Sequence, residues 1–150
     1  MNRVRSLALV GAAVLVWGSA GCAPSTVVRA EPGWKSLEIR EDLTYDQCWM
    51  TAVDLLTRDW DIEMMDKNSG YIRTAWHYGV GGQSAQAYRG RITVKFPDTK
   101  KPAVVEVKTE AQWVDPMGNA NVWVPGYDTA MQRDVFSAIG GRVGRSVPRE

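Results

Sequence analysis

Two segments of the chain repeat apolar residues at steps of three and four, the spacing that gathers them on one side of an amphipathic helix. The first segment follows Thr44, which with Gln47 forms a predicted capping box, and it extends for about 15 residues toward Trp60. The second segment begins near Asp128. Its apolar stripe consists of Met131, Val135, Ile139 and Val143. The pattern therefore predicts one helix before and one helix after a central region.

Four segments of that central region alternate apolar and polar residues, as antiparallel strands with one wet face require. They cover residues 62–66, 71–78, 88–96 and 103–113. In the second segment the alternation predicts one shared face for Ile72, Thr74, Trp76 and Tyr78. A possible short edge strand, with Leu37 and Ile39 on one side, precedes the first helix.

Charges suggest a register for the last two of these strands. Pairing Phe96 with Val105 places Lys95 opposite Glu106 and Arg91 opposite Glu110, two favourable cross-strand pairs. The predicted fold class is α+β, with two helices packed on one face of a four-stranded antiparallel meander in a helix-grip-like arrangement. We expect a single domain over residues 35–147.

The N-terminus has the order of a secretory signal. Arg3 and Arg5 precede an apolar run at residues 7–17, and small residues lead to Cys22. The run is too short to cross a bilayer, which takes about 20 residues. Residues 1–21 are therefore predicted to be a signal peptide.

Ala20, Gly21 and Cys22 resemble the lipobox of bacterial lipoproteins. The resemblance implies cleavage before Cys22, lipidation of that cysteine and attachment to the membrane through the lipid. Because Ala23 follows the cysteine, it also implies sorting to the outer membrane, where the protein would face the periplasm. Residues 22–34 then form the acylated cysteine and a flexible tether. The alternative is an ordinary secreted protein with a cysteine close to its cleavage site.

Without Arg3 and Arg5, the 18 basic residues become 16 against 17 acidic ones, so the charge gives no reason to expect a nucleic-acid partner. The single histidine, His77, is predicted to face solvent, and Cys48 lies on the apolar stripe of the first helix, where a structural thiol is expected. We expect no enzyme activity, cofactor or metal. A deep cleft that gathers His77 with several carboxylates would reopen the enzyme hypothesis.

A further resemblance rests on the segment from Thr44 to Trp49 and on Gly70, Tyr71, Ile72, Arg73, Thr74, Ala75 and Trp76. Together with the Arg-rich strand that follows, they resemble the helix-grip domains of the NlpB family, lipoproteins of the outer-membrane β-barrel assembly machinery. The likeness covers roughly residues 43–113. It implies a shared architecture and an envelope setting.

The segment at residues 114–126 places Trp123 between Val122 and Val124. One interpretation is an edge strand or lid over the core. The other is an aromatic anchor for a protein partner, which with Trp34 could form a single apolar patch. The leading hypothesis is a non-catalytic, membrane-tethered interaction or assembly accessory module in the cell envelope. The alternative is a carrier or sensor that holds an apolar ligand between helices and sheet, and a cavity lined by Trp49, Trp76 or Trp113 would favour it.

Overall fold

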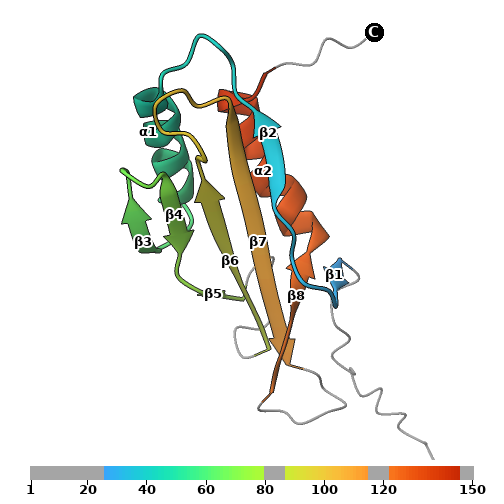
Figure 1. Cartoon of the computed structure of the whole chain (residues 1–150). Coiled ribbons are helices and arrows are strands. Elements are labelled where there is room, and N and C mark those ends of the chain that lie inside the picture. The colour runs from blue at the N-terminus through green and yellow to red at the C-terminus, as the bar shows by residue number, and fades with distance from the viewer. Residues whose placement is uncertain (1–25, 80–86, 115–121, 146–150) are drawn as a thin grey trace, which may run out of the picture.

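The computed structural model describes residues 26–79, 87–114 and 122–145, which form eight strands and two helices (Figure 1). The strands are β1 (Val27–Val28), β2 (Lys35–Glu38), β3 (Ile62–Asp66), β4 (Tyr71–Thr74), β5 (His77–Tyr78), β6 (Tyr88–Lys95), β7 (Val104–Val114) and β8 (Trp123–Asp128). The helices are α1 (Tyr45–Leu56) and α2 (Thr129–Val143). All the strands belong to one antiparallel sheet.

The pairing of β6 with β7 confirms the predicted register. Lys95 lies opposite Glu106 and Arg91 opposite Glu110, with 2.9 Å between Arg91 Nε and Glu110 Oε2. The apolar rows of both strands are buried, as predicted. Their buried residues are Tyr88, Ile92, Val94, Val105, Val107, Thr109, Ala111 and Trp113.

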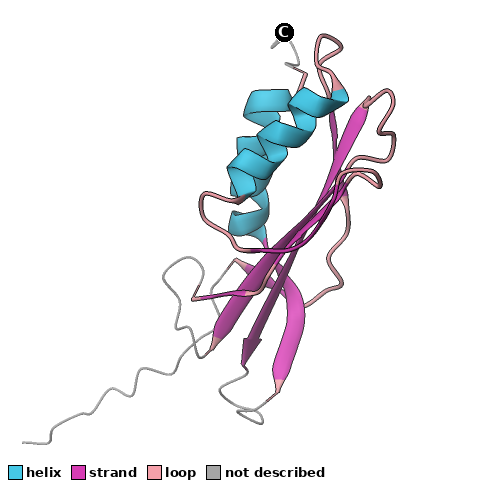
Figure 2. Cartoon of the chain, turned by 90° about the vertical axis from the view of Figure 1, so that its left-hand side faces the viewer, coloured by secondary structure: helices cyan, strands magenta, loops and turns pink. Residues whose placement is uncertain are grey.

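Both helices lie on the same side of the sheet and cover these rows (Figure 2). The capping box of α1 is confirmed, because Thr44 Oγ1 accepts from the Gln47 N–H and Gln47 Oε1 accepts from the Thr44 N–H. Asp128 caps α2 through the N–H groups of Ala130 and Met131. α1 ends at Leu56, before the predicted end near Trp60.

The predicted four-stranded meander is wrong, because the sheet has eight strands and is not a simple meander. Strand β7 has 11 residues, and β6 pairs along one of its edges. Its other edge would leave a row of backbone groups unpaired. Two short strands from distant parts of the sequence cover that edge: β2 pairs with residues 104–107 and β8 with residues 111–114.

Part of the predicted tether belongs to the fold. Val27 and Val28 pair with Asp128 and Tyr127 of β8, so the sheet begins five residues after Cys22. The possible edge strand near Leu37 is β2. Residues 1–25, which include Cys22 and the predicted signal peptide, lie outside the described part of the chain.

The predicted strand at residues 71–78 is interrupted by one extra residue. Arg73 opposes Thr93 and His77 opposes Gly90, so four steps along β4 and β5 match three steps along β6. Such a β-bulge reverses the alternation of side chains beyond it. Ile72 and Thr74 are buried as predicted, but Trp76 and Tyr78 lie on the opposite face of the sheet, beside arginines of β6.

Candidate docking face

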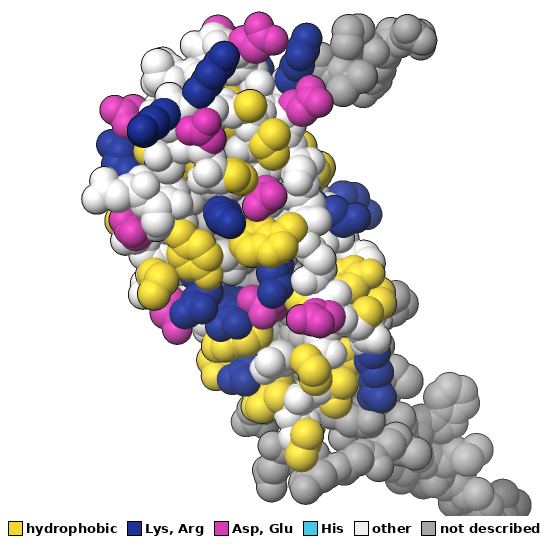
Figure 3. All heavy atoms as spheres, in the orientation of Figure 1, with side chains coloured by type: hydrophobic (Ala, Val, Ile, Leu, Met, Phe, Trp, Pro, Cys, Tyr) yellow, Lys and Arg dark blue, Asp and Glu magenta, His cyan; other side chains and the backbone are white. Residues whose placement is uncertain are grey.

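Five side chains on the helix-free face of the sheet form an aromatic–arginine cluster: Trp76, Tyr78, Arg89, Arg91 and Trp123. The Arg89 guanidinium lies 4.3 Å from the ring centroid of Trp123, 4.7 Å from that of Trp76 and 5.7 Å from that of Tyr78. The Arg91 guanidinium lies 4.4 Å from the Trp76 ring. These distances are within the range of cation–π attraction. Figure 3 looks onto this face, where basic and apolar side chains alternate over its lower part.

Three separate segments bring these side chains together. Strand β6 supplies both arginines, the bulge turns Trp76 and Tyr78 toward them, and β8 adds Trp123 from the end of the sequence. The Tyr78 and Trp123 rings meet edge to face at 6.2 Å between centroids. The cluster therefore exists only when β5, β6, β7 and β8 are paired in this register.

Hydrogen bonds fix the orientation of Arg89. Its Nε and Nη2 donate to Gln112 Oε1 at 2.9 and 2.6 Å, and Nη1 donates to Tyr78 Oη at 3.0 Å. All of these partners are neutral, and no carboxylate of the described residues forms an ion pair with Arg89. A guanidinium has five N–H groups, so two of those of Arg89 have no acceptor among the described residues.

Arg91 is more fully neutralised. It forms a two-pronged pair with Glu110, and both side chains are only 20% exposed. The hydrogen bond to Glu110 raises the pKa of Arg91 above its ordinary value. The positive charge that the cluster offers to a partner is therefore concentrated at Arg89.

The structure places the predicted binding residues Val122, Trp123 and Val124 in different surroundings. Trp123 and Val124 pair with Val114 and Trp113, as the edge-strand interpretation expects. Trp123 joins the aromatic–arginine cluster, whereas Val124 packs on the core side against the group that contains Trp113. Val122, just before β8, is 53% exposed.

Trp34 does not share a patch with Trp123. It is 43% exposed and precedes Lys35, which pairs with Val107, whereas Trp123 pairs with Val114. Seven residues along a strand span roughly 24 Å at about 3.4 Å per residue.

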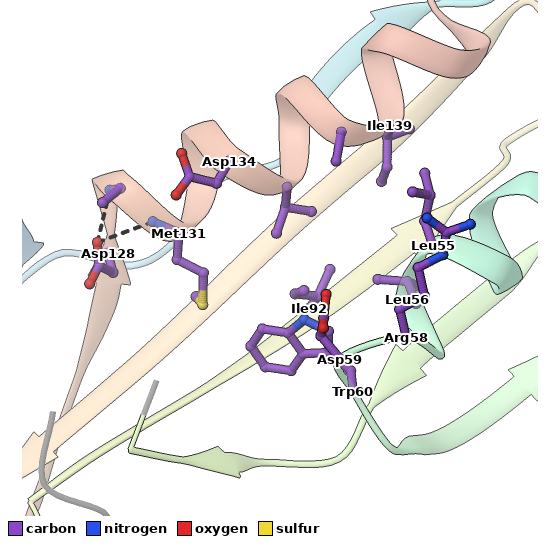
Figure 4. A pocket seen from close by; sticks show the side chains of 13 residues that line it. Leu55, Leu56, Arg58, Asp59, Trp60, Ile92, Asp128, Met131, Asp134 and Ile139 are labelled. Atoms are coloured by element: carbon purple, nitrogen blue, oxygen red, sulfur yellow. Dashed lines mark hydrogen bonds between the residues drawn. The ribbon is translucent and has the colours of Figure 1, made fainter. Parts of the chain in front are cut away.

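A pocket of about 480 Å³ lies between the two helices on the other face of the sheet (Figure 4). We call it the interhelical pocket. Its apolar lining includes Leu55, Leu56, Trp60, Ile92, Met131, Val135 and Ile139. A cavity lined by Trp49, Trp76 or Trp113 would have favoured a ligand carrier, but none of these three residues lines this pocket.

The structure also places the single histidine, His77, and the cysteine of the first helix, Cys48. His77 is exposed, with Nδ1 3.1 Å from the Asp59 carbonyl oxygen and its ring against Trp60. Cys48 is fully buried, and burial raises the pKa of its thiol. In the described part of the chain, no group of three or more His, Cys, Asp or Glu side chains is arranged to hold a metal ion. None of the described helices is both long enough and apolar enough to span a bilayer.

Sequence reasoning found Trp123 but missed Trp76, Tyr78 and Arg89. Strict alternation predicts Trp76 and Tyr78 in the core, and it predicts Arg89 on a solvated sheet face. The extra residue before Trp76 leaves no local sequence signal such as a glycine, because Ala75 occupies the bulge region. The only feature of the sequence that could have drawn attention to this part of the site was Trp76 itself, next to His77.

Comparison with protein families and with curated proteins identifies no relative: no family model matches the chain, and no curated protein matches it.

Proposed function

We propose that this chain is a non-catalytic lipoprotein that acts as a protein-interaction or assembly accessory module in the bacterial cell envelope. The lipid on Cys22 anchors it to the outer membrane, and the folded domain faces the periplasm. The aromatic–arginine cluster is the surface that receives an envelope protein partner.

The observation that carries this proposal is the composition of that cluster. Tryptophan, tyrosine and arginine are the residue types that dominate the binding energy of protein interfaces. Here they form one surface, and Tyr78 remains 48% exposed. Because Arg89 has neutral hydrogen-bond partners, a partner segment that presents a carboxylate between apolar side chains would complement it.

The test uses in-cell photocrosslinking of the full chain. A photoreactive residue replaces Trp123 in one variant, and in the control it replaces Trp34, an exposed tryptophan outside the cluster. We expect a discrete protein adduct from position 123 and none from position 34. Adducts of equal yield at both positions, or no protein adduct at position 123, would contradict docking through the cluster.

Once the partner has been identified from the adduct, Trp123→Ala should weaken binding about tenfold or more, as expected for an interface hot spot. Trp34→Ala removes the same side chain elsewhere on the surface and should leave the affinity within about twofold. Binding of the purified proteins can be compared by calorimetry. Equal losses in the two variants would show that the cluster is not the binding surface.

The interhelical pocket favours a second candidate function, that of a carrier or sensor for an apolar ligand. Its volume of about 480 Å³ falls within the range of small-molecule sites, about 300–1,000 Å³. Its lining is largely apolar, as it is in most such sites. Native mass spectrometry of the purified protein tests this candidate. A bound, exchangeable lipid would support a carrier, and a protein that carries no such mass would not.

A further inference from the structure

The interhelical pocket extends as far as the start of α2. Asp128 at the end of β8 lines it together with Ala130 and Met131 of α2 (Figure 4). Leu55, Leu56 and Trp60 line it from the end of α1 and the turn that follows. Ile92 of β6, which is completely buried, lies at its base. A narrow apolar ligand can therefore lie between the helices and against the sheet.

The charges at the pocket disfavour an anionic ligand. Three carboxylates line it, those of Asp59, Asp128 and Asp134, against one guanidinium, that of Arg58. Arg58 already donates to Asp54 at 2.8 Å. A free fatty acid would bring a further negative charge to this lining, whereas an ester-linked acyl chain is neutral.

The N-terminal segment of the chain is attached beside this pocket. The backbone N–H and the hydroxyl of Thr129 both donate to the Thr26 carbonyl oxygen, at 2.9 and 3.0 Å. Thr129 lies between Asp128 and Ala130, two of the lining residues. Cys22 precedes Thr26 by four residues, which span at most about 14 Å when fully extended. Lipid on Cys22 would thus be within reach of the part of the pocket that Asp128 and Ala130 line.

We propose that the interhelical pocket takes one neutral acyl chain, and that this chain belongs to the lipid on Cys22 of the same molecule. The inference rests on the lipid anchor of the proposed function, but it does not depend on docking through the aromatic–arginine cluster. The pocket keeps this one chain out of water while the rest of the anchor stays in the bilayer.

The experiment places a photoreactive residue at four neighbouring positions of α2 in the full chain, produced in bacteria with its lipid anchor. Asp134 and Ala138 line the pocket, while Arg133 and Ser137 beside them do not, and all four are exposed. These substitutions therefore leave the core intact. After irradiation of isolated membranes, the protein is digested and its peptides are identified by mass spectrometry.

We expect positions 134 and 138 to be linked to the acyl group of the Cys22 peptide at least tenfold more often than positions 133 and 137. Links from 134 and 138 to lipid that is not attached to the protein would overturn the assignment to the protein's own anchor. Equal labelling at all four positions would overturn the pocket as the site.

The same digests report on the anchor independently of any crosslink. An acylated Cys22 peptide without pocket-specific links rejects this inference and leaves the proposed lipoprotein intact. A Cys22 peptide without acyl groups rejects both this inference and the proposed lipoprotein.

Discussion

Two buried threonines of the sheet differ in a single hydrogen bond. The Thr74 hydroxyl oxygen accepts from the Ile92 N–H at 2.9 Å, whereas the Thr109 hydroxyl has no hydrogen-bond partner among the described residues. Both side chains are completely buried. Removing a hydroxyl from water costs free energy, and a hydrogen bond inside the protein offsets that cost. The two positions therefore offer a matched comparison at the scale of one residue.

Thr109→Val should raise the free energy of unfolding by about 1 kcal/mol, because it removes a buried polar group that forms no hydrogen bond. Thr74→Val should lower it by about 1–3 kcal/mol, because it leaves the Ile92 N–H unpaired. Urea denaturation of the purified domain measures both values. A loss of stability in Thr109→Val as large as that in Thr74→Val would contradict the assigned hydrogen bonds.

At the scale of elements, one side chain ties the sheet to the start of α2. Tyr88 of β6 donates its hydroxyl to Asp128 Oδ2 at 2.7 Å, and the other oxygen of Asp128 caps α2. Burial, followed by the hydrogen bond to the Asp128 carboxylate and its charge, raises the pKa of Tyr88 above its ordinary value of 10.0. Below that value the phenol is protonated in both folded and unfolded chains. Above it the unfolded chain loses the proton first, so this contribution to stability falls as the pH rises.

Tyr88→Phe should lower the free energy of unfolding by about 1.5–3 kcal/mol at pH 7, as expected for a hydrogen bond to a charged acceptor. The difference between the two proteins should shrink above pH 10, by up to about 1.4 kcal/mol per pH unit. Denaturation series at pH 7, 9, 10 and 11 measure the difference directly. If it stays constant across this range, the Tyr88 phenol does not have the raised pKa that its surroundings imply.

At the scale of the whole molecule, the first described residues of the chain meet the start of α2 at one edge of the sheet. Strand β1 pairs with β8, and the Thr26 carbonyl oxygen accepts a hydrogen bond from Thr129, more than 100 residues later in the sequence. Gly126 lies where β1 passes β8. A Cβ atom at that position would collide with the Val28 carbonyl oxygen and would lie 2.8 Å from the Trp113 ring. The close approach of the two segments therefore requires glycine.

Gly126→Ala should destabilise the fold by about 1–3 kcal/mol, the usual cost of overpacking, and should loosen β1. Faster hydrogen exchange of the amides at residues 26–30 would report that release. Gly141→Ala is the control, because a Cβ there meets nothing within 4 Å and alanine favours the helix by up to about 1 kcal/mol. Unchanged exchange at β1 in Gly126→Ala would contradict a tight contact between these strands.

Features with a local cause were predicted well. The capping box at Thr44, the start of the second helix near Asp128 and the pairing of Arg91 with Glu110 are all present. The eight-stranded sheet was not predicted, because β1 and β2 pair with strands far away in the sequence. The candidate site was found only in part: Trp123 was identified, but its grouping with Trp76, Tyr78 and Arg89 was not.

The sequence by itself determined the two helices, the central β6–β7 pair and which of their faces is buried. Those features depend on residues that are close together in the sequence, within one helix or one hairpin. Only the tertiary structure decided what covers the free edge of β7 and on which face Trp76 and Tyr78 lie. The physical reason is that backbone groups at a sheet edge accept any suitable strand, and one extra residue in a paired strand exchanges its two faces. Neither effect is visible until the partner strand is in place.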